Sequence, residues 1–353
     1  MRWDGQKIAA EADGALPGLA LAGLQRSVRT PDFAGVTFHE VHARSALNKV
    51  PEASAMPFRW TVNPMRGCLH ACTYCFARPT HEYLGLGPGE DFQTQIVVKT
   101  NVVDVLAAEL RRPSWRHEHV ALGTNTDPYQ RAEGRYALMP GIIGALADSG
   151  TPLSLLTKGT LLRRDLPLLA QAASQVEVSV AVSLAIGDEA LQQALEPGTP
   201  TPRARLALVR AVREAGLECG VLVAPVLPWL TDSTAHLDGL LRDLADAGAS
   251  WVTVIPLHLR GPVRPLVLGW LREHRPELVP RYQRLYGRGA YVPDEYHRWL
   301  RDRLRPLRRR HGLFGPGVAQ EGAAPSPSPW RAQPAATATP PAVLPGVVQP
   351  ALF

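Results

Sequence analysis

The sequence lacks the features of a membrane-bound or secreted protein. No run of apolar residues approaches the ~20 needed for a membrane-spanning helix. The first residues, MRWDGQKIAAEADG, contain no basic segment followed by an apolar one, so we expect no secretory signal and no membrane partner. Only four of the 353 residues are cysteines, too few for a secreted disulfide framework. We therefore expect a cytoplasmic protein.

Lysine is also scarce, because only four of the 38 basic residues are lysines. The net charge is +6, but residues 260–310 alone contain 14 arginines and five acidic residues. Within that region the spacing of Arg298, Arg301 and Arg305 predicts a basic stripe along one face of a helix. The stripe would suit a nucleic acid as partner, while a general preference for arginine is the simpler explanation.

Composition divides the chain into four regions. Residues 1–57 mix Gly, Pro and Ala with little periodicity and predict an irregular N-terminal extension. Residues 58–259 alternate short apolar runs with helical segments, and residues 260–317 predict a basic helical region. Residues 318–353 are rich in Pro and Ala with almost no charge, which predicts a disordered tail.

The central region determines the fold class. Strands that alternate with helices imply right-handed βαβ units and a parallel sheet. Asn101 is expected to cap one helix, and Pro202 to open another that ends at Gly216. We predict an α/β fold, a partial (βα)6 barrel with a helical C-terminal appendage and a disordered tail. The six predicted strands are residues 59–63, 119–123, 152–157, 176–184, 218–224 and 251–255.

Three cysteines lie within eight residues, in the segment NPMRGCLHACTYCFAR directly after the first predicted strand. The spacing C-x3-C-x2-C can place Cys68, Cys72 and Cys75 around one centre at the edge of the sheet where such folds build active sites. A [4Fe-4S] cluster normally takes four protein ligands, so three would leave one iron open. A structural zinc site also needs four, and neither His70 nor the distant Cys219 is a convincing fourth ligand.

This segment resembles the cluster loop of the radical S-adenosylmethionine superfamily. Together with GTNTDPYQ, LLTKG, RRDLPLL, EPGTPTPRARL and VAPVLPWLTD, it is similar to the branch related to spore photoproduct lyase. The resemblance implies a [4Fe-4S] cluster on Cys68, Cys72 and Cys75, with S-adenosylmethionine chelating the open iron. It also implies reductive cleavage of S-adenosylmethionine to a 5′-deoxyadenosyl radical, and an electron donor such as flavodoxin or ferredoxin.

The resemblance further implies where S-adenosylmethionine lies. Its methionine part is expected at the C-terminal ends of the second to fourth strands, where hydroxyls and amides suit an ammonium group and a lysine suits a carboxylate. A turn or an exposed lysine would explain several of the same residues without a ligand. No catalytic residue is assigned. The expected cofactor-binding residues are Tyr74, near the cluster and the adenine, and Thr124, Asn125, Thr126, Asp127, Lys158 and Ser183.

One departure from the resemblance concerns the substrate. The lyase returns hydrogen to its product from a cysteine near the end of the second strand, and the matching residue here is Thr124. Cys219 is expected to be a buried small hydrophobe. We therefore do not expect thymine-dimer reversal by that donor route. We predict a radical S-adenosylmethionine enzyme with an unidentified substrate, for which DNA or another nucleic acid is the first candidate and a peptide or a small metabolite is an alternative. The alternative is a non-enzymatic protein that holds zinc on the cysteines and binds nucleic acid.

Overall fold

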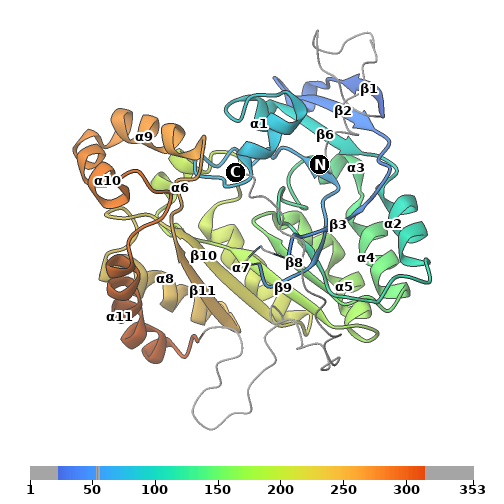
Figure 1. The fold of residues 1–353 in the computed structure, drawn as a ribbon. Coiled ribbons are helices and arrows are strands. Elements are labelled where there is room, and N and C mark those ends of the chain that lie inside the picture. The colour runs from blue at the N-terminus through green and yellow to red at the C-terminus, as the bar shows by residue number, and fades with distance from the viewer. Residues whose placement is uncertain (1–22, 53, 55, 315–353) are drawn as a thin grey trace, which may run out of the picture.

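The computed structural model describes residues 23–314, except residues 53 and 55 (Figure 1). A seven-stranded sheet in the order β11-β10-β9-β8-β7-β4-β3 forms its centre. Strands β4 to β11 of this sheet run parallel, and β3 is antiparallel to β4. The parallel strands coincide with the six predicted runs. The bounds are β3 (Leu47–Lys49), β4 (Trp60–Val62), β7 (Val120–Leu122), β8 (Leu153–Thr157), β9 (Val178–Ser183), β10 (Cys219–Val226) and β11 (Trp251–Pro256).

Helices connect these strands and bury an apolar face against the sheet. Leu106, Ile142, Leu169 and Leu208, one from each of four helices, are fully buried in the main core. Figure 1 shows α2, α4 and α5 side by side along one flank of the sheet. The predicted partial (βα)6 barrel is confirmed. The helices are α2 (Val102–Leu110), α3 (Glu133–Tyr136), α4 (Met139–Asp148), α5 (Leu166–Ala173), α6 (Glu189–Leu195), α7 (Pro202–Glu214) and α8 (Thr234–Asp246).

A second sheet of four strands, in the order β1-β2-β6-β5, stands beside the first. It combines β1 (Leu24–Val28) and β2 (Thr37–Val41) with β5 (Met65–Arg66) and β6 (Gln95–Lys99). The predicted irregular extension over residues 1–57 is therefore wrong for residues 24–49, which contain three strands, and residues 1–22 lie outside the described part. β2 is a strand because it pairs in parallel with β6, a partner that local periodicity does not reveal.

Short helices complete the connections of both sheets. Helix α1 (Asp91–Thr94) precedes β6. The 3-10 helices are Pro31–Phe33, Arg78–Leu84, Thr160–Asp165 and Pro276–Leu278.

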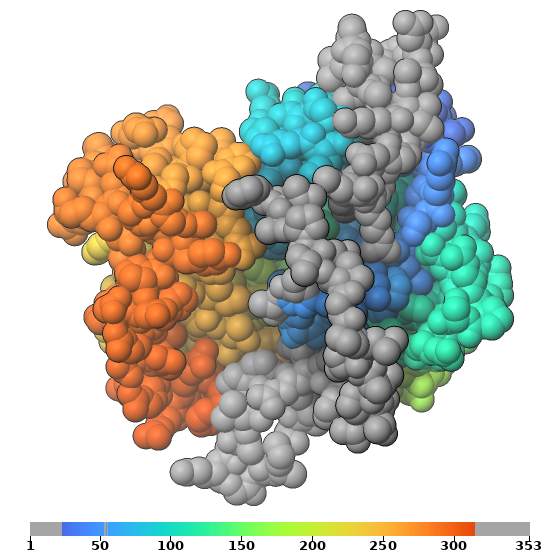
Figure 2. Space-filling model, viewed as in Figure 1, coloured from blue at the N-terminus to red at the C-terminus, as the bar shows by residue number. Residues whose placement is uncertain are grey.

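Three helices form the C-terminal region: α9 (Val263–His274), α10 (Val279–Tyr286) and α11 (Asp294–His311). Leu300 and Leu304 of α11 are buried in the main core, so the region packs firmly on the barrel. On the face in Figure 2 these helices, in orange, form one side of the molecule, opposite α2. The predicted tail lies outside the described residues. Within residues 23–314, no helix combines the length and apolar character needed to cross a membrane.

Candidate cofactor site

The cysteine loop follows β4 and the short β5, and it is anchored to the second sheet. The backbone N–H of Cys68 donates to the Phe92 carbonyl at 2.9 Å. Gly67, at φ +81°, has no room for a side chain, because a Cβ there would lie 2.8 Å from the same carbonyl oxygen. The buried Arg78 closes the loop from the other end, donating to the carbonyls of Cys72 at 3.0 Å and Ala71 at 3.2 Å. Backbone contacts therefore fix the course of the loop.

The thiols of this loop lie in a poorly solvated environment. Cys68 and Cys72 are buried and Cys75 is half-buried. Burial raises the pKa of Cys72 well above its usual value, although Lys158 opposes the shift, and raises that of Cys75 to about 11. Such thiols become good thiolate ligands when a cationic centre compensates their charge. Three thiols on one loop are the donor set of an iron–sulfur cluster, so these residues fit the expected group.

The fourth cysteine is not part of this site. Cys219 begins β10, is fully buried in the main core and has its thiol pKa raised to about 12 by burial. It is the buried small hydrophobe that the sequence predicts. In the described part of the chain, no three Cys, His, Asp or Glu side chains converge closely enough to hold a single metal ion.

A buried polar network lies beside the loop and centres on Glu196, which we call the Glu196 network. Glu196 accepts hydrogen bonds from Tyr74 Oη and from Arg205 Nη2, the latter at 2.6 Å, and both members of the ion pair are 0% exposed. Lys158 Nζ lies 3.9 Å from Glu196 and donates to Ser183 Oγ at 2.8 Å. The structure thus brings together three predicted cofactor-binding residues, Tyr74, Lys158 and Ser183.

The charges of this network are stable at neutral pH. Burial alone would raise the pKa of Glu196, but Arg205 and Lys158 hold it below its usual value. Burial alone would lower the pKa of Lys158, but Glu196 and Cys72 raise it. The Arg205 Nε is buried without a hydrogen-bond partner. Lys158 Nζ and Arg205 Nη1 both donate to Ser183, at 2.8 and 3.0 Å, and two cations around one residue fit the carboxylate of S-adenosylmethionine.

The other predicted residues lie after β7 and bond mainly to the protein itself. Thr124 Oγ1 and the N–H of Asn125 donate to Asn63 Oδ1 at 3.3 and 3.1 Å. Thr126 Oγ1 donates to the Gly67 carbonyl at 2.6 Å. These contacts join the β7 end to the start of the cysteine loop.

The Asp127 carboxylate interacts with residues from separate segments of the chain, and His70 is one of them. Its carboxylate accepts from Thr157 Oγ1 at 2.5 Å and from the Lys158 N–H at 2.6 Å. His70 Nδ1 lies 3.3 Å from Asp127 Oδ2. Burial alone would lower the pKa of His70, but Asp127 and Cys68 raise it to about 10.

Sequence reasoning missed Glu196 and Arg205, although both lie in the segment EPGTPTPRARL. Their separation follows no helix or strand period, so the pattern did not pair them. Between them, the Gly198 N–H donates to the His70 carbonyl at 3.1 Å, and a Cβ on Gly198 would lie 2.0 Å from the Leu69 carbonyl oxygen. A glycine is therefore required where this segment crosses the cysteine loop.

Residues 62–241 match the family model of the Radical SAM superfamily. An uncharacterized protein of Mycobacterium tuberculosis is 66% identical over 319 residues, covering 89% of this chain and 94% of that protein. An uncharacterized protein of Methanocaldococcus jannaschii is 26% identical over 199 residues, covering 55% and 69%. The names of these relatives give no information about an activity. The family match favours the enzyme over the zinc-binding alternative.

Solved structures of spore photoproduct lyase share the fold. The complex with dinucleoside spore photoproduct has a TM-score of 0.60 and 19% identity, and covers 79% of this chain and 81% of that chain. A mutant of that protein with bound AdoMet and dinucleoside spore photoproduct also has a TM-score of 0.60, with 18% identity. At such identity the likeness concerns the fold alone. Since the family model covers just over half of its length, the chain belongs to the radical S-adenosylmethionine superfamily, whose members use a [4Fe-4S] cluster and S-adenosylmethionine.

Proposed function

We propose that Cys68, Cys72 and Cys75 hold the [4Fe-4S] cluster and that the protein reductively cleaves S-adenosylmethionine. When bound, the cofactors supply the electron transfer and the 5′-deoxyadenosyl radical that abstracts hydrogen from a substrate. The observation that carries the proposal is the position of the three thiols, on one rigid loop next to the charged Glu196 network.

The residues of this chain would bind, orient and shield the reactants. The Lys158 amine and the Arg205 guanidinium would bind the S-adenosylmethionine carboxylate, with Ser183 orienting the amine. Tyr74, whose ring centroid is 6.0 Å from Lys158 Nζ, would lie along the adenine side. Burial of these groups keeps water from a reactive radical. Thr124, Asn125 and Thr126 would hold the loop that presents the cluster.

The test is anaerobic reconstitution with iron and sulfide, followed by incubation with dithionite and S-adenosylmethionine. We expect about four iron and four sulfide per chain, as a [4Fe-4S] cluster contains, and release of 5′-deoxyadenosine. A colourless protein with stoichiometric zinc, or a full cluster without cleavage, would overturn the proposal.

For the substrate, we propose a nucleic acid, on the evidence of a hollow at the C-terminal end of β10. The hollow, about 470 Å³, is lined by Trp229, Arg281, Arg284, Leu285 and Pro293. Trp229 is 42% exposed, and α10 is held next to it by the Tyr282 hydroxyl, which donates to the Pro228 carbonyl at 2.9 Å. An exposed aromatic ring flanked by arginines suits a stacked base with its phosphates.

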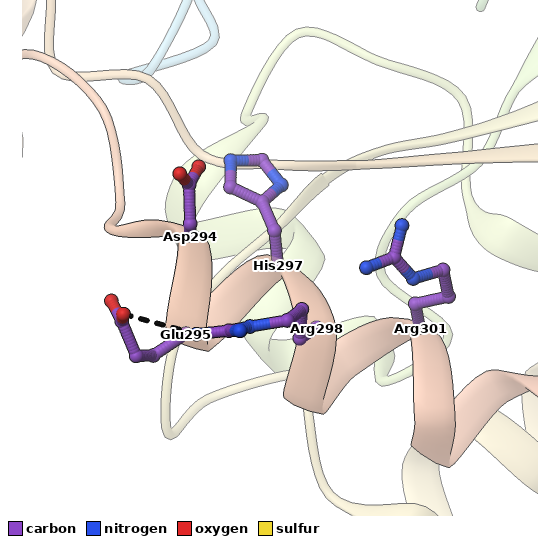
Figure 3. A pocket seen from close by; sticks show the side chains of 5 residues that line it. All are labelled: Asp294, Glu295, His297, Arg298 and Arg301. Atoms are coloured by element: carbon purple, nitrogen blue, oxygen red, sulfur yellow. Dashed lines mark hydrogen bonds and ion pairs between the residues drawn. The ribbon is translucent and has the colours of Figure 1, made fainter.

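The predicted basic stripe on α11 offers fewer unpaired arginines for phosphate binding than the sequence indicates. Arg298 pairs with Glu295 at 3.1 Å, and Arg305 pairs with Asp302. Figure 3 shows the first of these pairs in the hollow at the start of α11, which Arg301 also lines. Two of the three stripe arginines therefore face acidic neighbours on their own helix.

We expect Trp229→Ala to weaken binding of a fluorescent single-stranded oligonucleotide about tenfold, because base stacking contributes about 1–3 kcal/mol per base. Arg284→Gln should weaken binding and reduce its salt dependence. Arg298→Gln is the matched control, since that side chain already pairs with Glu295. Anisotropy titrations at two salt concentrations measure both effects. No binding by the wild type, or equal losses in all three variants, would favour a peptide or a small metabolite.

A further inference from the structure

The carboxylate of Asp127 is saturated with hydrogen-bond donors. Oδ1 accepts from Thr157 Oγ1 at 2.5 Å and from the Tyr129 N–H at 2.9 Å. Oδ2 accepts from the Lys158 N–H at 2.6 Å and faces His70 Nδ1 at 3.3 Å. A carboxylate offers about four acceptor positions, so no position is left for a ligand ammonium group.

The partners of Asp127 belong to three segments whose relative positions determine the geometry of the proposed site. Tyr129 lies in the loop after β7, Thr157 ends β8 and Lys158 follows it, and His70 lies in the cysteine loop. The His70 side chain is 4% exposed, and its imidazole is close enough to Cys68 for the thiol to raise the pKa of His70. One carboxylate thus connects an expected cluster ligand to the backbone of Lys158.

We propose that Asp127 is a positioning residue, which acts through His70 on the Cys68 side of the cluster and through the backbone of Lys158 on S-adenosylmethionine, without contacting S-adenosylmethionine itself. This inference rests on the proposed function. It differs from direct cofactor binding by Asp127, which the sequence suggests. Outer groups that orient the ligands of an iron–sulfur centre also set its reduction potential.

Asp127→Asn distinguishes positioning of the site from direct binding of S-adenosylmethionine. The Thr157 hydroxyl and the two backbone N–H groups donate to the carboxylate, and a protonated His70 Nδ1 can donate as well. In asparagine, one of the two carboxylate oxygens is replaced by an NH2 group, which cannot accept these hydrogen bonds. In either orientation of the amide, one backbone N–H, that of Tyr129 or that of Lys158, faces this NH2 group. The variant should therefore disturb His70 and the β8 end even when no S-adenosylmethionine is present.

The experiment is a double-mutant cycle of Asp127→Asn and His70→Ala, read out as the reduction potential of the cluster without S-adenosylmethionine. Displacement or loss of the His70 imidazole near Cys68 should move the potential to more negative values in both single variants. Because the residues act in series, the double variant should shift no further than the larger single shift. Asp104→Asn, an exposed aspartate on α2, is the control and should leave the potential unchanged.

The opposite pattern would overturn the inference: a potential equal to wild type in Asp127→Asn, with S-adenosylmethionine affinity at least tenfold weaker. If Asp127→Asn does not fold, Thr157→Val removes one donor without touching the loop and should shift the potential in the same direction. A wild-type protein that takes up no cluster would overturn the proposed function instead. If the wild type cleaves S-adenosylmethionine and Asp127→Asn leaves the reduction potential unchanged, only this inference is overturned.

Discussion

Cys72→Ala is expected to abolish 5′-deoxyadenosine release. Two remaining thiols cannot hold a four-iron cluster that already has one ligand fewer than usual. The matched control is Cys219→Ala, because both residues are buried, at 7% and 0% exposed, but Cys219 lies in the β10 core. Both variants should fold, with similar modest losses of stability. Chromatography of the reaction mixture and iron content per chain measure the effect.

Retention of cleavage by Cys72→Ala would mean that the cluster assignment is wrong. Loss of cleavage in Cys219→Ala with normal iron content would mean that the fourth cysteine has a chemical role, against the geometry. The pair of variants therefore separates loss of a ligand from loss of a buried sulfur atom.

Arg205→Met is expected to lower the free energy of unfolding by about 3–5 kcal/mol, because it leaves the Glu196 carboxylate buried without its main partner. Both side chains are fully buried. Adding Glu196→Gln removes the stranded charge, so the double variant should recover a large part of the loss. Urea denaturation at neutral pH gives the values. A double variant as unstable as the single one would contradict the argument.

The same ion pair predicts a dependence on pH. The folded-state pKa of Glu196 lies below its usual 4.5, since Arg205 and Lys158 outweigh burial. The pair therefore contributes its full stability above pH 4.5, and this contribution is lost as the pH falls through the folded-state pKa. Arg205→Met should remove this part of the acid sensitivity.

The sequence allowed the strands and the cysteine loop to be predicted because their signals are local. Apolar β-branched runs identified the six parallel strands, and the spacing of the cysteines identified the loop. Asn101 shows where local reasoning fails: it makes no side-chain cap and instead bonds the Ala43 N–H at 2.8 Å and carbonyl at 3.1 Å. Glu196 and Arg205 were missed for the same reason, since only the folded chain brings them together.

Because of the second sheet, the part of the chain that matches the family model is not a separable structural unit. β2 lies between β1 and β6, and β6 holds β5, the strand that leads into the cysteine loop. Glu109 Oε2 accepts from the N–H groups of Ala46 and Leu47, at 3.0 and 2.8 Å. A fragment that begins at residue 62, where the family match begins, would lack β2 and leave the edge of β6 unpaired. It would also leave the buried Glu109 carboxylate without its two backbone donors. A graft of this catalytic unit onto another protein must therefore carry the segment from Leu24 with it.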